Sequence, residues 1–195
     1  MSFSDILSLS LIAIFAENIV FGHMLGVTPF IKNSENTKSA AKAGISVTLT
    51  MLIFSALSYV AEKSIIIPFE LEYMRTVIFV VIIAGGLCIG ETVLKKKFTS
   101  FAERTEISAS YIAVNTAILG IMLVTVNENR DFWGSVIYAL ASGIGFTMAI
   151  TLFACVRERM EYSDVPEVFE GVPIALITAG LIALAFSGFQ EIKFM

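Results

Sequence analysis

Six long stretches of apolar residues constrain this chain more than any other feature of its sequence. A helix of about 20 residues, rising about 1.5 Å per residue, crosses the roughly 30 Å hydrocarbon core of a bilayer. Only 15% of the 195 residues are charged, whereas about a quarter are charged in a typical soluble domain. The sequence therefore predicts an all-α integral membrane protein, with helices over Ile6–Leu25, Ala40–Ala61, Met74–Leu94, Ile107–Val126, Phe132–Val156 and Val172–Phe189.

The connections between these stretches are short and polar. None is long enough to form a soluble domain, so we expect one membrane domain over residues 1–195. The first five residues lack the basic start of a cleaved signal, which predicts that the first stretch stays as a helix. No basic face is long enough to follow a phosphate backbone, so the sequence indicates no nucleic-acid partner.

The distribution of Lys and Arg predicts the orientation of the chain. Basic residues stay on the cytoplasmic side of a membrane protein. Four of the 13 Lys and Arg residues lie on the face that carries the termini. The other nine lie on the opposite face, in the first, third and fifth connections: Lys32, Lys38, Lys42, Lys95, Lys96, Lys97, Arg104, Arg157 and Arg159. We therefore expect six spans with both termini outside.

Three spans in each half mean that the second half enters the membrane upside down relative to the first. The sequence AGGL at 84–87, in the third stretch, is similar to TAGL at 178–181, in the sixth. Transporters are often built from inverted repeats of this kind. We expect an inverted three-plus-three repeat with halves of about 1–98 and 99–195.

Polar interruptions occur in the first stretch of each half. Gly26 and Pro29 bracket Thr28 in the sequence LGVTPF at 25–30, and Pro29 has no backbone N–H, so the first helix should stop or kink there. Asn115 and Thr116 lie near the middle of the fourth stretch, where polar groups are costly without a partner. The pattern predicts interrupted first and fourth helices that form a site at the bilayer midplane. A packing kink and a hydrogen-bonded Asn are the alternative.

Glu17 and Asn18 lie about twelve residues into the first stretch, near the predicted midplane. A carboxylate at that depth should face the protein interior, a partner or water, which makes it a candidate cation or proton site. The alternative is a protonated Glu17 that fixes the position of the helix through hydrogen bonds. His23 is the only histidine and cannot form a metal site alone.

The sequence contains no motif that indicates catalysis or metal binding. There is no phosphate-binding loop, dinucleotide fingerprint or nucleophile paired with a histidine, so catalytic residues are not predicted and neither is a metal site. Cys88 and Cys155 lie within apolar stretches and do not indicate a disulfide framework. The mixed-charge sequence from Arg157 to Glu170 is either a solvated loop or a docking site for a soluble partner.

Several of these motifs resemble one known family. LGVTPF at 25–30 looks like that family's LGLCPF, and NTAILG at 115–120 is similar to its NCAVLG. RER at 157–159, DVP at 164–166 and IALITAGL at 174–181 resemble its C-terminal third. The family is RnfA/NqrE, a membrane subunit of Rnf-type and Na⁺-translocating quinone reductase complexes, and the resemblance runs through nearly the whole chain.

This resemblance implies a multi-pass protein of the plasma (inner) membrane of a prokaryote. It implies six helices in an inverted repeat, a homologous partner of the RnfE or NqrD type, and further flavin and iron–sulfur subunits. In the family, cysteines of the two homologous subunits hold a [2Fe–2S] cluster at their interface. That cluster carries electrons across the membrane, coupled to Na⁺ or H⁺ movement. The chain would then be a subunit of a translocase complex rather than an enzyme alone.

Both positions that resemble the family's cysteines are threonine here, Thr28 and Thr116. Iron–sulfur clusters are held by thiolates, and a neutral hydroxyl is a poor substitute. Cys88 and Cys155 do not take their place, so we expect this chain to bind no cofactor. Two functions stay open: a subunit of an Rnf/Nqr-like complex, or a cysteine-free paralogue acting as a non-redox transporter or ion-conducting subunit. In the second, Thr28, Asn115 and Thr116 would line a site whose oxygen ligands suit Na⁺.

Overall fold

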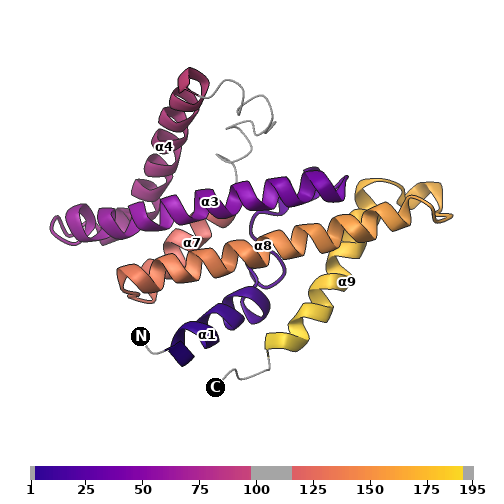
Figure 1. Ribbon diagram of the computed structural model, residues 1–195, viewed down its shortest axis with the longest axis horizontal. Coiled ribbons are helices and arrows are strands. Elements are labelled where there is room, and N and C mark those ends of the chain that lie inside the picture. The colour runs from indigo at the N-terminus through magenta and orange to yellow at the C-terminus, as the bar shows by residue number, and fades with distance from the viewer. Residues whose placement is uncertain (1–2, 98–115, 191–195) are drawn as a thin grey trace.

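The computed structural model describes residues 3–97 and 116–190, and all the regular structure in these residues is helical (Figure 1). Four of the helices are long and apolar enough to cross a membrane: Thr37–Ile66, Glu72–Ile89, Phe132–Met160 and Val172–Phe189. Two apolar helices are shorter, Ser4–Ala16 and Thr116–Asn127. The described part of the chain is therefore all-helical, with four candidate membrane-spanning segments.

Two long helices, α3 (Thr37–Ala61) and α8 (Phe132–Met160), pack side by side through the middle of the molecule (Figure 1). Each begins at a side-chain cap. The Asn36 side chain accepts a hydrogen bond from the Lys38 N–H, and Asp131 accepts one from the Gly134 N–H. Such caps satisfy backbone donors that have no partner in the first turn. The π-helical turn Glu62–Ile66 continues α3 at its other end.

The contact between α3 and α8 is reciprocal. Gly44 of α3 faces Thr147 of α8, and Gly143 of α8 faces Thr48 of α3. The two threonine hydroxyls lie 3.1 Å apart, and each also donates to the carbonyl of the glycine on its own helix. A Cβ at Gly44 would lie 2.8 Å from the Thr147 Cα, closer than real Cβ contacts allow. Glycine at these positions therefore permits the close approach of the two backbones.

The helices α4 (Arg75–Lys97) and α9 (Val172–Gln190) leave opposite ends of the α3–α8 pair and point away from it (Figure 1). Only 11% of the residues in the apolar window of each are buried, compared with 56% for α8. Two shorter helices, α1 (Phe3–Leu11) and α7 (Thr116–Asn127), pack against the central pair.

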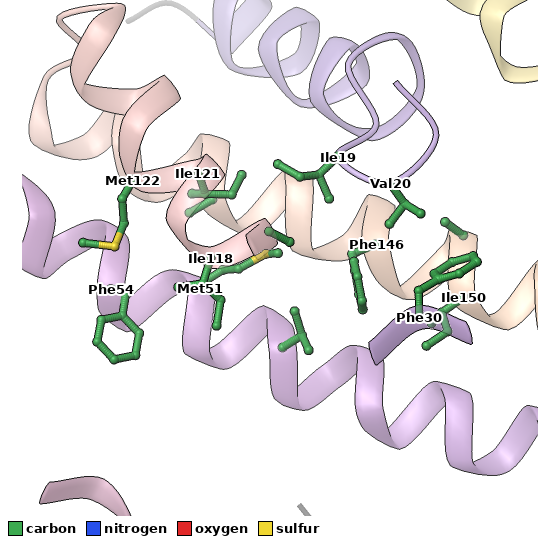
Figure 2. Packing of buried hydrophobic residues seen from close by; sticks show 14 of the residues in the cluster. Ile19, Val20, Phe30, Met51, Phe54, Ile118, Ile121, Met122, Phe146 and Ile150 are labelled. Atoms are coloured by element: carbon green, nitrogen blue, oxygen red, sulfur yellow. The ribbon is translucent and has the colours of Figure 1, made fainter. Parts of the chain in front are cut away.

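The hydrophobic core fills the space between α3, α7, α8 and the segment that follows α1 (Figure 2). Phe30 stacks on Phe153 with ring centroids 4.8 Å apart. Ten of the buried side chains are labelled in Figure 2: Ile19, Val20, Phe30, Met51, Phe54, Ile118, Ile121, Met122, Phe146 and Ile150. Residues from both halves of the chain thus share one core.

A partly buried ion pair joins three helices at one end of the molecule. Arg75, at the start of α4, pairs with Glu62 at 2.6 Å and donates to the Asn127 side chain at 3.1 Å. Glu62 is only 7% exposed. Removing one partner of such a pair leaves a buried charge, so this contact holds the ends of α3, α4 and α7 together.

The predicted spans agree with the structure in four places and differ in the first. The helices near Ala40–Ala61, Met74–Leu94, Phe132–Val156 and Val172–Phe189 all exist, with ends displaced by a few residues. The first predicted helix, Ile6–Leu25, is continuous only to Ala16. The fourth, Ile107–Val126, is described only from Thr116 onward, so Asn115 and the predicted break there lie outside the described residues.

Candidate functional site

The first apolar stretch is broken over ten residues. Helix α1 widens into a π-helical turn, Ile12–Ala16, where the Glu17 N–H donates to the Ile12 carbonyl at 2.7 Å. The backbone is then irregular from Glu17 to Gly26, and α2 (Val27–Lys32) resumes the helix. Turns of π-helix inside α-helices are frequent at functional sites. We call residues 17–26 the break.

The prediction for Pro29 needs a correction. The sequence predicts that the first helix ends or kinks between Gly26 and Pro29, whereas the structure ends it at Ala16 and starts a new one at Val27. Gly26 caps this new helix in the left-handed conformation, with φ 74°. Pro29 lies in its first turn, where a backbone N–H would have no helical acceptor and its loss does no harm.

Asn18 holds the start of the break in place. Its side-chain N–H group donates to the carbonyls of Ile14 and Gly145, at 3.0 and 3.1 Å. Its side-chain oxygen accepts from the N–H groups of Val20 and Phe21, at 3.1 and 3.3 Å. Asn18 is 1% exposed. Its buried side-chain amide therefore supplies hydrogen-bond partners to backbone groups that lie outside a helix in the break. Its bond to the Gly145 carbonyl also attaches the break to α8.

The end of the break is attached to α7. The Gly26 N–H donates to the Thr116 hydroxyl oxygen at 2.8 Å. Leu25 also packs directly over Gly120, where the leucine Cδ1 occupies the space that an added Cβ would need. The interrupted sequence in the first half therefore meets the polar position at the start of α7.

Glu17 lies against α8. The Tyr138 hydroxyl, in a side chain that is fully buried, donates to the Glu17 carboxylate at 3.1 Å. The guanidinium of Arg130 covers the Tyr138 ring at 4.4 Å from its centroid and forms an ion pair with Glu128. The Arg130 Nε is buried without a hydrogen-bond partner in the described part of the chain. These groups connect the α7–α8 turn to the break.

A second polar atom without a partner lies on the same side of α8. Ser142 is one helical turn after Tyr138 and three residues before Gly145, whose carbonyl binds Asn18. It is 1% exposed, and its hydroxyl has no hydrogen-bond partner among the described residues. Buried hydroxyls are normally hydrogen-bonded, so this face of α8 has spare hydrogen-bonding capacity toward the break.

The structure brings together only some of the predicted site residues. Glu17 and Asn18 both contact α8, and Thr116 contacts Gly26. Thr28 is exposed on the first turn of α2, two residues after Gly26. Tyr138 is not among the predicted site residues. The signal for it in the sequence is a tyrosine within an apolar stretch, because a buried tyrosine hydroxyl usually needs a hydrogen-bond partner.

The donor atoms at the two threonine positions do not suit an iron–sulfur cluster. Both offer neutral hydroxyl oxygens, and that of Thr116 already accepts the Gly26 N–H. Cys155 is exposed, with its sulfur 3.7 Å from the Thr37 hydroxyl, and Cys88 is exposed on α4. In residues 3–97 and 116–190, no three His, Cys, Asp or Glu side chains are grouped so that they could hold a metal ion.

Apolar helices of spanning length, with a helix break whose polar groups are enclosed by protein, define a polytopic helical membrane protein. Residues 6–193 match the family described as "Rnf-Nqr subunit, membrane protein". The chain belongs to this family.

Curated relatives match the chain over nearly their whole length. The A subunit of the Na(+)-translocating ferredoxin:NAD(+) oxidoreductase complex of Acetobacterium woodii is 39% identical over 93% of this chain and 94% of its own. The A subunit of the ion-translocating oxidoreductase complex of Shewanella oneidensis is 37% identical over 95% of this chain and 97% of its own. That of Aeromonas hydrophila is 39% identical over 88% and 89%.

Proposed function

We propose that this chain is a membrane subunit of an Rnf/Nqr-like complex, which carries electrons across the membrane coupled to Na⁺ or H⁺ movement. The observation that carries this proposal is the match to the A subunits of ion-translocating oxidoreductase complexes over 88–95% of this chain, at 37–39% identity. A match of that extent includes the loops as well as the helices. The expected partners are flavin and iron–sulfur subunits and a homologous membrane subunit of the RnfE/NqrD type.

The fold that we propose for the full chain is one membrane domain of six helices, in an inverted repeat with halves of about 1–98 and 99–195. The reciprocal contact of α3 and α8 supports it, because GISVT at 44–48 and GIGFT at 143–147 provide equivalent glycine and threonine residues. The departure of α4 and α9 from opposite ends of that pair also supports it (Figure 1). In this arrangement α7 is the counterpart of the broken first segment.

We further propose that both termini lie outside the plasma (inner) membrane of a prokaryote. The excess of Lys and Arg in the connections on the opposite face supports this orientation. The helices α4 and α9 carry exposed apolar residues, for example Val77, Val81, Leu181 and Leu184. We expect lipid and the homologous subunit to cover these residues.

Within the complex, we propose that Glu17, Asn18 and Asn115 contribute to an ion or polar site near the break. The carboxylate of Glu17, the hydroxyl of Tyr138 and the unpartnered hydroxyl of Ser142 support a polar region there. Thr28 and Thr116 take the positions of the family's cysteines in the resemblance, so we propose that this chain supplies no ligand to an iron–sulfur cluster.

A second function is favoured by the same two threonines. Hydroxyl and carbonyl oxygens are ligands for Na⁺ rather than for iron, which fits a non-redox transporter or ion-conducting subunit. The two functions differ in what the chain assembles with, because only the first requires flavin and iron–sulfur subunits.

Purification of the chain from its native membrane, through a tag on the chain, tests the proposal. We expect flavin and iron–sulfur subunits in the purified material and electron transfer that responds to Na⁺ or to the proton gradient. Purification with membrane subunits alone, together with ion transport that needs no electron donor, would support the non-redox function and overturn the first.

A further inference from the structure

The connection between α8 and α9 carries exposed apolar side chains in an acidic surrounding. Tyr162 is 91% exposed, Val168 is 83% exposed and Phe169 is 45% exposed. Four carboxylates and no Lys or Arg occur between Met160 and Val172 in the sequence: Glu161, Asp164, Glu167 and Glu170. We call residues 161–171 the acidic connection.

The acidic connection has a defined shape. The Ser163 N–H donates to the Met160 carbonyl at 3.0 Å, and the Phe169 N–H donates to the Pro166 carbonyl at 2.8 Å, within the 3₁₀ turn Glu167–Phe169. Gly171 ends it in the left-handed conformation, with φ 80°. The exposed apolar residues are therefore presented on a structured loop, which lowers the entropy lost when a partner binds.

A hollow of about 480 Å³ adjoins the acidic connection. Glu35, Glu161 and Glu170 line it together with apolar groups of Met160, Val165 and Ile174. Arg157 also lines it, but its guanidinium donates to the Ile31 carbonyl and the Ser34 hydroxyl, at 2.8 and 2.9 Å. Among the described residues, no Lys or Arg forms an ion pair with the carboxylates of Glu35 or of the acidic connection.

We propose that the acidic connection and its hollow bind the basic face of a water-soluble subunit of the same complex. Tyr and Phe are enriched at the centres of protein interfaces, where a few such residues supply most of the binding free energy. Unpaired carboxylates around them complement Lys and Arg and speed the encounter. The hollow combines carboxylates with apolar walls, as a Lys or Arg side chain with its methylene stem requires.

A lipid surface fits these residues less well. The 29 residues of α8 span about 43 Å at about 1.5 Å per residue, which exceeds the roughly 30 Å hydrocarbon core. The acidic connection then lies beyond the hydrocarbon. Anionic headgroups attract basic segments and repel carboxylates. The partner is therefore a protein, and this inference rests on the proposed function because that function supplies soluble subunits.

Photo-crosslinking in the intact complex tests the inference. The photoreactive residue p-benzoyl-phenylalanine replaces Tyr162. As a matched control it replaces Tyr73, which is 81% exposed in the connection between α3 and α4. We expect Tyr162 but not Tyr73 to give a crosslink to a soluble subunit, at a peptide rich in Lys or Arg. A crosslink from position 162 to lipid or to a membrane subunit, or no crosslink, would overturn the inference.

A salt titration is the second test of the inference. The variant Glu167→Gln/Glu170→Gln should lose the soluble subunit from washed membranes at a lower KCl concentration, with binding weakened about fivefold for each exposed ion pair lost. Tyr162→Ala should weaken it about tenfold or more. Glu70→Gln/Glu72→Gln, in the connection after α3, is the matched control and should behave as wild type. Equal retention in all variants contradicts the inference, whereas a chain that purifies without any soluble subunit contradicts the proposed function instead.

Discussion

The backbone N–H of Gly26 donates to the side-chain hydroxyl of Thr116, 90 residues later in the chain, at 2.8 Å. This hydrogen bond joins the end of the break in the first half to the first turn of α7 in the second. The Thr116 hydroxyl oxygen that accepts it stands at a position where, by the resemblance, the Rnf/Nqr family has a cysteine.

Replacement of Thr116 should show what this bond contributes. Thr116→Val keeps the shape of the side chain but removes the acceptor, so the Gly26 N–H loses its partner. We expect a loss of about 1–3 kcal/mol in the free energy of unfolding, measured by thermal unfolding of the purified complex. Thr116→Ser should retain most of the stability. Thr50→Val is the control, because the Thr50 hydroxyl only donates to a carbonyl in its own helix; an equal loss there would contradict the assignment.

Asn18→Ala should be more damaging. It removes four hydrogen bonds at a buried side chain and leaves the N–H groups of Val20 and Phe21 without that acceptor. We expect a loss of about 3 kcal/mol or more, since each buried polar group left unpaired costs about 1–3 kcal/mol. The matched control is Asn36→Ala at the exposed cap of α3, for which about 1 kcal/mol is expected. Similar melting temperatures for the two variants would argue against the role of Asn18.

The contact of α3 with α8 predicts a strong effect of one added methyl group. In Gly143→Ala the new Cβ would lie 2.9 Å from the Thr48 Cα, so the helices must separate, at a cost of about 1–3 kcal/mol. Gly180→Ala on α9 is the control, because a Cβ added there would have no atom within 4 Å among the described residues outside its own helical turn. Alanine at that position should be neutral or stabilising, by up to about 1 kcal/mol. Scanning fluorimetry of both variants compares them directly.

Glu17 and Tyr138 should affect activity more than assembly. Glu17→Gln keeps the size of the side chain and can still accept the Tyr138 hydrogen bond, so the complex should assemble. Loss of the carboxyl group should lower ion-coupled electron transfer, measured as Na⁺ or H⁺ uptake into membrane vesicles. Tyr138→Phe should reduce the same uptake to a smaller extent, because it removes only the hydrogen bond. Normal uptake in Glu17→Gln would reduce this residue to a packing role.

The two threonines predict the iron content. The wild-type chain should contribute no iron to the complex, because its hydroxyls cannot replace thiolates. Thr28→Cys/Thr116→Cys supplies both ligands at once and should add iron and acid-labile sulfide when the homologous subunit keeps its own cysteines. Each single variant is the control and should add none. Stoichiometric iron bound at Thr28 and Thr116 in the wild-type complex would contradict this prediction.

Much of the helical architecture can be predicted from this sequence, because the length of an apolar stretch and the position of its caps are local properties. The helix α9, predicted over Val172–Phe189, differs from the structure by one residue. The extension of α8 to Met160 is not predicted, because Arg157 and Arg159 look like the end of a membrane helix although a helix can continue into water.

The break could not be placed from local properties. Five of the seven residues from Ile19 to Leu25 have large apolar side chains, as in a spanning helix, and Pro29 is the strongest local signal for a helix end. Asn18 competes for the backbone N–H groups of Val20 and Phe21, and it does so with the help of the Gly145 carbonyl from the other half. The break therefore depends on a contact between distant parts of the chain, which a pattern within one stretch does not reveal.

The break also bears on the order in which the molecule is made. Asn18 binds a carbonyl that is synthesised 127 residues later, and Glu17 binds a hydroxyl that is synthesised 121 residues later. Unpaired backbone groups in hydrocarbon each cost several kcal/mol. The segment that leaves the ribosome first must therefore reach the bilayer as a different structure, or wait beside the insertion machinery, and adopt its final shape only after α8 has followed it into the membrane.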